Sequence, residues 1–162
     1  SAGQSNQGSN SIALGVNSGQ TSQGLYSISL GYRAGSSNQG LSSIAIGSDS
    51  AISSQGTNAI AIGANTGNDT QGQYSLAIGA AAGSSSQSSY SIALGVSAGQ
   101  SNQGSNSISI GLTSGTTSQL SDSILRAKNL LPSVLLQVIH LKKKNLYVLV
   151  IILAIKNKVQ MQ

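Results

Sequence analysis

The sequence repeats with a period of 16 residues, without an insertion or deletion, from residue 11 to residue 122. Seven complete units run over 11–26, 27–42, 43–58, 59–74, 75–90, 91–106 and 107–122, and residues 1–10 are the end of an earlier unit. We number the positions of each unit from one to sixteen, beginning at Ser11. Such a repeat is typical of an array of small structural units that bury their hydrophobic faces by stacking on one another.

Several positions of the unit hardly vary. The second and fourth positions are always Ile or Leu, with Ala or Ser between them. The fifth position is always Gly, the ninth is Gly except at Ala51, and the thirteenth is always Gln. The second-position residues are Ile12, Ile28, Ile44, Ile60, Leu76, Ile92 and Ile108. The fourth-position residues are Leu14, Leu30, Ile46, Ile62, Ile78, Leu94 and Ile110. The glutamines are Gln7, Gln23, Gln39, Gln55, Gln71, Gln87, Gln103 and Gln119.

Two large apolar residues with a small one between them have the periodicity of a β-strand. The following Gly ends the strand, so the segment is too short to be a helix. Units stacked as parallel strands about 4.8 Å apart would give an all-β solenoid of about seven rungs, roughly 34 Å long. We expect the second- and fourth-position aliphatics to be the core ladder. The small third-position residue should then face the opposite side.

The invariant Gln predicts a ladder of side-chain amides, each carbonyl accepting a hydrogen bond from the amide of the next rung. An unpaired buried amide would cost about 1–3 kcal/mol, so the column is either mutually paired or exposed to solvent. Two aliphatics per rung make a thin core, which leaves a monomer marginally stable. We therefore expect the chain to associate with itself, through the smooth Ala/Ser face.

Charge divides the chain into two parts. Residues 1–122 contain one basic residue, Arg33, and three acidic ones, Asp49, Asp69 and Asp122. Residues 123–162 contain no acidic residue and seven basic ones: Arg126, Lys128, Lys142, Lys143, Lys144, Lys156 and Lys158. The net charge of +5 therefore describes the tail and not the repeats, and we expect no nucleic-acid partner. We assign residues 1–124 to a repeat domain and residues 125–162 to an atypical apolar and basic tail.

Residue types that carry chemistry are scarce. Three Asp and His140 form no paired-carboxylate or triad spacing, and Gly-x-x-x-Gly is not followed by the Lys of a phosphate-binding loop. A calcium-binding repeat would need Asp in every rung, and a flat ice-binding face usually needs a regular array of Thr. We predict no enzyme activity, no cofactor and no metal site. The sequon Asn68-Asp69-Thr70 is expected by chance in a chain this rich in Asn and Ser.

The segments SIALG, AIAIG and SLAIG, each followed by a Gly/Ala/Ser turn, resemble the head repeats of YadA-like trimeric autotransporter adhesins. The resemblance covers residues 1–124 and implies a left-handed parallel β-roll, a homotrimer and attachment to a bacterial outer membrane. It also implies binding to host matrix or to a cell-surface ligand. The family repeat is about two residues shorter and lacks the Gln-Gly pair. Similar repeats occur in fibre-like proteins of phages and large viruses.

Four interpretations of the tail compete. A stalk is suggested by a heptad of apolar residues, although Pro132 interrupts it. Membrane insertion is disfavoured, because the apolar run of residues 146–155 is too short for a spanning helix. A β-hairpin around residues 142–145 could cap the solenoid. A faint 16-residue echo, such as Leu130 with Leu146, suggests a repeat read in another frame, which we favour.

Together these observations favour a fibrous protein exposed on a cell surface or a virion, acting in adhesion or as a spacer. A virion or phage fibre with the same roll is the alternative, and an ice-binding solenoid is a lesser one. We expect any membrane attachment to lie outside this sequence.

Overall fold

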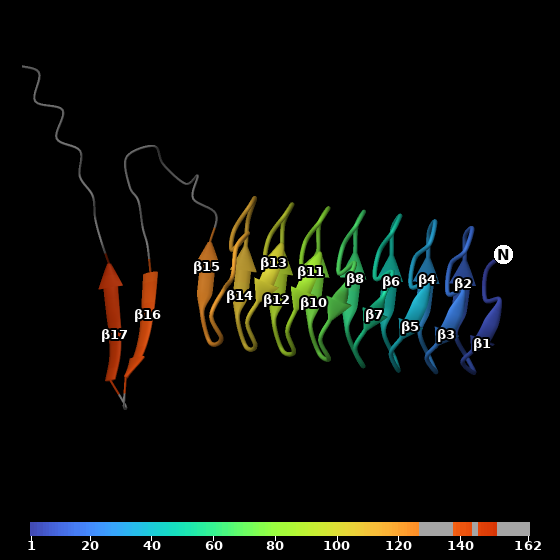
Figure 1. Cartoon of the computed structure of the whole chain (residues 1–162), viewed down its shortest axis with the longest axis horizontal. Coiled ribbons are helices and arrows are strands. Elements are labelled where there is room, and N and C mark those ends of the chain that lie inside the picture. The colour runs from blue at the N-terminus through green and yellow to red at the C-terminus, as the bar shows by residue number, and fades with distance from the viewer. Residues whose placement is uncertain (127–137, 144–145, 152–162) are drawn as a thin grey trace, which may run out of the picture.

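The chain winds into a parallel β-solenoid in which each 16-residue unit forms one rung (Figure 1). The computed structural model describes residues 1–126, 138–143 and 146–151. Six of the seven complete rungs contribute one short strand to each of two sheets, and residues 107–122 contribute a strand to the first sheet only; turns join the strands. The all-β solenoid predicted from the repeat is therefore confirmed.

The first sheet, here called the aliphatic sheet, contains the strands predicted at positions two to four. Its eight strands are β2 (Ile12–Leu14), β4 (Ile28–Leu30), β6 (Ile44–Ile46), β8 (Ile60–Ile62), β10 (Leu76–Ile78), β12 (Ile92–Leu94), β14 (Ile108–Ile110) and β15 (Ile124–Arg126). Residues with the same position number pair across neighbouring strands, as in Ile28 with Ile44 and Leu30 with Ile46. The fixed period thus holds every rung in the same register, because a shift of one residue would reverse the faces.

The second sheet, here called the glutamine sheet, was not predicted. It has seven strands, which end at the invariant Gln: β1 (Ser5–Gln7), β3 (Thr21–Gln23), β5 (Ser37–Gln39), β7 (Ser54–Gln55), β9 (Thr70–Gln71), β11 (Ser85–Gln87) and β13 (Ser101–Gln103). An isolated bridge from Gln103 to Gln119 continues it. These segments carry no aliphatic pattern, and backbone hydrogen bonds between successive rungs define them instead.

The two faces of the aliphatic sheet are the reverse of our expectation. The third-position residues Ala45, Ala61, Ala77 and Ala93 are fully buried, whereas Ile12 and Leu14 are 56% and 63% exposed. The largest fully buried side chains are Gln71, Gln87 and Gln103. The interior of each rung is therefore filled by Ala, Ser and Gln, and the second- and fourth-position aliphatics point outward. The assignment of those aliphatics to the core of one chain is wrong.

The fifth-position glycines allow successive rungs to approach closely. Gly79 has a φ of 123°, and a Cβ placed there would lie 2.6 Å from the backbone carbonyl of Gly95. Gly15, Gly31, Gly47 and Gly95 have a similar φ and face the next rung's backbone in the same way. A side chain at this position would therefore force the rungs apart.

The ninth-position glycines meet a side chain instead. At Gly67, with a φ of 54°, an added Cβ would lie 2.9 Å from the Oε1 atom of Gln71. Ala51 occupies this position in its own rung, with a φ of 49° and full burial. The neighbouring Gln amide can thus adjust to a Cβ, as the backbone beside Gly79 cannot.

The tail begins inside the solenoid. β15 pairs with β14, matching Ile124 to Ile108, so the strand ladder runs two residues beyond the boundary that we placed at residue 124. Farther on, β16 (Val138–Lys143) and β17 (Leu146–Ile151) form an antiparallel pair. This pairing is the one that the hairpin interpretation predicts, and a helical stalk would require helix there. Pro132 and the tail's other predicted features at 127–137, 144–145 and 152–162 lie outside the described residues.

The two glycine columns predict different sensitivities to alanine. Gly79→Ala should lower the free energy of unfolding by at least about 3 kcal/mol, because strained φ and a backbone clash combine. Gly67→Ala should cost only about 1 kcal/mol, the penalty of a left-handed alanine beside a movable amide. Urea unfolding of the full chain, followed by circular dichroism, measures both. Equal losses at the two sites would contradict the distinction between a backbone and a side-chain neighbour.

Candidate association surface

The predicted core ladder forms an apolar outer surface on the aliphatic sheet. We define the aliphatic face as the second- and fourth-position residues from Ile12 to Ile110, together with Ile124. Its side chains are exposed towards the two ends of the solenoid, where Leu94 and Ile110 retain 40% and 43% of their accessible surface, and half-buried in the middle. The two columns run along the solenoid for about 34 Å, with about 4.8 Å between rungs. The residues of this face carry no charge, and Arg126 occupies the fourth position in β15.

A third column follows the face at the turn after each strand. The sixth-position side chain is exposed in every complete rung. Backbone hydrogen bonds stack this turn from rung to rung, as from Arg33 N–H to the Val16 carbonyl (2.8 Å) and from Thr113 N–H to the Val96 carbonyl (2.9 Å). The sixth-position residues are Val16, Tyr32, Ser48, Ala64, Ala80, Val96 and Leu112. This column thus has large residues in its outer rungs and small residues in its middle rungs.

The sixteenth position supplies aromatic residues at the turn that precedes the strand. The exposed rings of Tyr74 and Tyr90, in successive rungs, are stacked with centroids 5.3 Å apart and planes inclined by 6°. The stack follows from the rung spacing, because identical positions lie one above another.

The invariant glutamines cross the interior of the solenoid. From Gln23 to Gln119 they are buried, and each Nε2 donates to the carbonyl of the second-position residue in its own rung. The Gln71 amide, for example, lies 2.7 Å from the Ile60 carbonyl. Gln7, in the partial unit, is exposed and donates to the Ser11 carbonyl. The glutamines therefore join the two sheets of a rung.

The predicted amide ladder exists only locally. Among the described residues, amide-to-amide bonds run from Gln39 to Gln55 (3.3 Å) and from Gln55 to Gln71 (3.1 Å). These bonds surround the rung of Ala51, the one complete rung that has a Cβ at the ninth position. The glutamines of the complete rungs are thus buried rather than exposed, and the ladder prediction is wrong about their main partner, which is a backbone carbonyl.

A third-position Ser supplies a donor to the Gln oxygen of its rung. Where the third-position residue is Ser, its hydroxyl donates to the Gln oxygen of the same rung, at 2.5 Å in both Ser29–Gln39 and Ser109–Gln119. Where it is Ala, the Oε1 atoms of Gln23, Gln87 and Gln103 are buried without a hydrogen-bond partner. The sequence shows that the third position is either Ala or Ser. It does not show that this choice affects the Gln oxygen, because it does not place the Gln in the interior.

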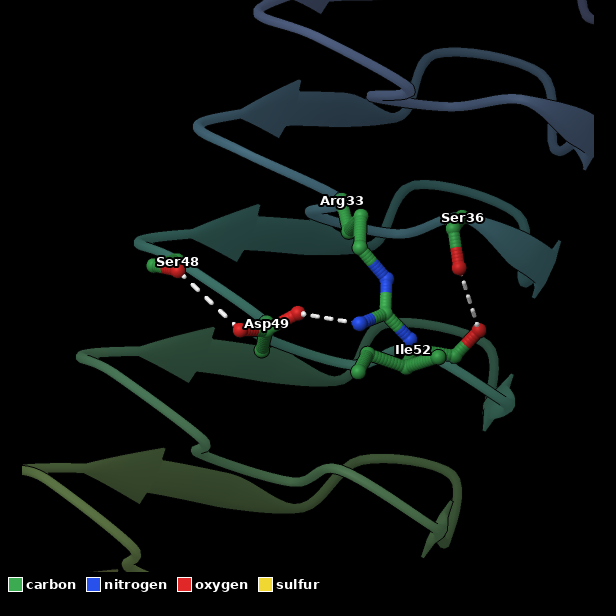
Figure 2. Close-up of polar contacts among 5 residues, drawn as sticks. All are labelled: Arg33, Ser36, Ser48, Asp49 and Ile52. Atoms are coloured by element: carbon green, nitrogen blue, oxygen red, sulfur yellow. Dashed lines mark hydrogen bonds and ion pairs between the residues drawn. The ribbon is translucent and has the colours of Figure 1, made fainter.

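Among the side chains that the structure describes, charged groups form one ion pair. Arg33 Nη1 lies 3.2 Å from Asp49 Oδ1, and the Ser48 hydroxyl lies 3.1 Å from Asp49 Oδ2 (Figure 2). Beside them, the Ser36 hydroxyl donates to the Ile52 carbonyl at 3.0 Å. The Arg33 side chain is 44% exposed, so the pair contributes little stability. The ion pair links the seventh positions of two successive rungs.

The part of the chain that the structure describes holds no group of three or more His, Asp or Glu side chains placed to bind a metal ion. It also contains no helix long and apolar enough to cross a membrane. The chain matches no protein-family model, no curated protein and no solved structure. Its most distinctive surface is thus the aliphatic face with its sixth-position border.

Exchanging Ala and Ser at the third position should change stability in opposite directions. Ala77→Ser gives the buried Gln87 oxygen a donor, and we expect it to raise the free energy of unfolding by about 1 kcal/mol. Ser29→Ala removes the donor to Gln39 and should cost about 1–3 kcal/mol. Ala45→Ser is the matched control, because the Gln55 oxygen already accepts from Gln39. Urea unfolding of the full chain measures all three variants. Equal effects of Ala77→Ser and Ala45→Ser would contradict this interpretation.

Proposed function

We propose that the protein is a surface-exposed fibrous module for adhesion or structural spacing, which associates with copies of itself as a homotrimer. Its setting is a bacterial cell surface, outside an outer membrane, or the surface of a virion. The observation that carries the proposal is the aliphatic face, which a solitary solenoid would leave in water. A closed oligomer of the same chain covers it along the whole length.

The size of the face supports self-association. Over a length of about 34 Å and a width of about 13 Å, from the second to the sixth position, the aliphatic face and its sixth-position border together cover roughly 450 Å². Soluble monomers rarely expose contiguous apolar patches larger than a few hundred Å². Two such surfaces would bury about 900 Å², near the lower limit for specific interfaces, so the sixth-position border must take part in the contact.

The position of the face changes the mode of association expected from sequence. The Ala/Ser surface proposed there is buried inside each chain, as Ala61 and Ser29 show. Contact between chains therefore involves the large aliphatics, which bury more apolar area per rung than small residues do. The resemblance to trimeric adhesins supports three copies as the closed form.

An adhesive role would use the opposite sheet. The twelfth-position side chains on the glutamine sheet are exposed hydroxyls and amides: Ser22, Asn38, Ser54, Thr70, Ser86, Asn102 and Ser118. They recur about every 4.8 Å, which suits multivalent binding of a repetitive ligand through many weak contacts. A viral fibre would present the same surface.

Charge on the aliphatic face should dissociate the oligomer. In sedimentation experiments, the full chain should have three times its single-chain mass, and Ile60→Lys with Ile62→Lys should shift it to a monomer, because two buried charges would lack partners. The matched control, Ser54→Lys with Ser86→Lys on the glutamine sheet, should keep the oligomer. Circular dichroism of each variant separates dissociation from unfolding. A well-folded monomeric parent chain would overturn the trimer.

Binding assays separate adhesion from the other candidate functions. The full chain should bind surfaces coated with reconstituted extracellular matrix or cultured cells, and the Ser54→Lys, Ser86→Lys control should bind less. Binding to neither surface would favour a structural spacer or a fibre. Thermal hysteresis in the same protein solution would contradict both roles and favour ice binding.

A further inference from the structure

A repetitive apolar face leaves the alignment of two copies ambiguous. Because every complete rung carries Ile or Leu at positions two and four, sliding one copy by one rung replaces each aliphatic by an equivalent one. Such a slip loses contact only at the ends, about one rung in seven. Association through this face alone would therefore give chains in several alignments, as weakly specified strands do.

The sixth-position column breaks this ambiguity. It carries Val16 and Tyr32 in the first two complete rungs, Ser48, Ala64 and Ala80 in the middle, and Val96 and Leu112 in the last two. The large members are 60%, 50%, 49% and 54% exposed, so their side chains are available to another chain. Unlike the aliphatic columns, this column differs from one rung to the next.

We propose that the sixth-position column sets the alignment of associated copies, so that each rung packs beside the same rung of a parallel second copy of this chain. This inference rests on the self-association proposed above. In the aligned arrangement the bulky rungs meet bulky rungs and the small rungs meet small ones. A shift of one rung places Tyr32 beside Ser48 and Val96 beside Ala80, which leaves one gap at each place. An antiparallel arrangement would also bring large residues together, as Val16 beside Leu112. The turns of the two copies would, however, run in opposite directions.

A second copy is the occupant that these observations favour. It alone repeats both the period of the aliphatic face and the large–small–large order of the border. The face carries no charge, and the nearby Arg33–Asp49 pair is already formed within the chain, so neither an acidic nor a basic partner is selected. Same-rung pairing also brings the border into the interface, which the marginal area of the aliphatic face requires.

Cysteine cross-linking tests the alignment directly, because the chain has no cysteine. Ile44→Cys and Leu76→Cys place single thiols at the second position, two rungs apart. Neighbouring chains aligned rung for rung bring equal positions within the reach of a disulfide, and positions two rungs apart lie about 10 Å farther along the axis. When the two variants are co-expressed and oxidised, same-position dimers should outnumber mixed dimers by at least about tenfold, the ratio that 1.4 kcal/mol gives. Peptide mass spectrometry counts both.

A uniform border should abolish this preference. In the background Val16→Ala, Tyr32→Ala, Val96→Ala and Leu112→Ala, mixed dimers should become about as abundant as same-position dimers. The matched control is a background that keeps a large residue at each of these positions, Val16→Leu, Tyr32→Phe and Val96→Leu. It should keep the parent cross-linking pattern. An unchanged pattern in the alanine background would overturn the alignment role of this column.

Sedimentation of the same preparations separates the two proposals. A monomeric chain without cross-links would refute self-association itself. An oligomer with abundant mixed dimers in the parent chain would leave self-association standing and refute the alignment. An oligomer that cross-links only between distant positions would show antiparallel packing, which also overturns the inference.

Discussion

The hydrogen bond from each invariant Gln to a carbonyl of the opposite sheet is the constraint on which the rest of the solenoid depends. One amide spans the interior of every rung, as from Gln71 to the Ile60 carbonyl, so the two sheets lie only one Gln side chain apart. Only Ala, Ser, Thr and Gly fit beside that amide, and the larger aliphatics are left outside. The Gln hydrogen bond across the rung thus limits which residues fit in the interior. In most domains the packing of apolar side chains sets this limit.

Much of this architecture could be predicted from the repeat. The strict period required stacked rungs, and the Ile-x-Leu pattern located the strands of the aliphatic sheet, because alternation is a local property of the chain. Alternation does not say which face is inside, and the usual preference for buried aliphatics gave the wrong answer. The sequence does contain a signal that identifies the interior face, which is a limit on side-chain size. The third position never exceeds Ala or Ser before residue 125, whereas the second varies between Ile and Leu and never becomes small.

The glutamine sheet was hidden for a different reason. Segments such as Thr21–Gln23 and Ser101–Gln103 have no aliphatic residue and low strand propensity. Their strands exist because neighbouring rungs, already fixed by the aliphatic sheet, place backbone donors and acceptors opposite one another, as tertiary context often does. The association surface could not be predicted for a different reason: the usual preference for buried aliphatics places its residues in the interior.

A chain with a small polar interior has to find its hydrophobic stabilisation elsewhere. Backbone hydrogen bonds between rungs contribute modestly once water competes, and buried Ala contributes little apolar area. The largest available favourable contribution is burial of the aliphatic face, and in the proposed self-association that burial takes place between chains. Folding and assembly would then be coupled, as in obligate oligomers, and the proposal makes the stability of each rung depend on protein concentration. Length follows from the same coupling, because each added rung extends the solenoid and its interface together, which suits a fibre better than a compact binding domain.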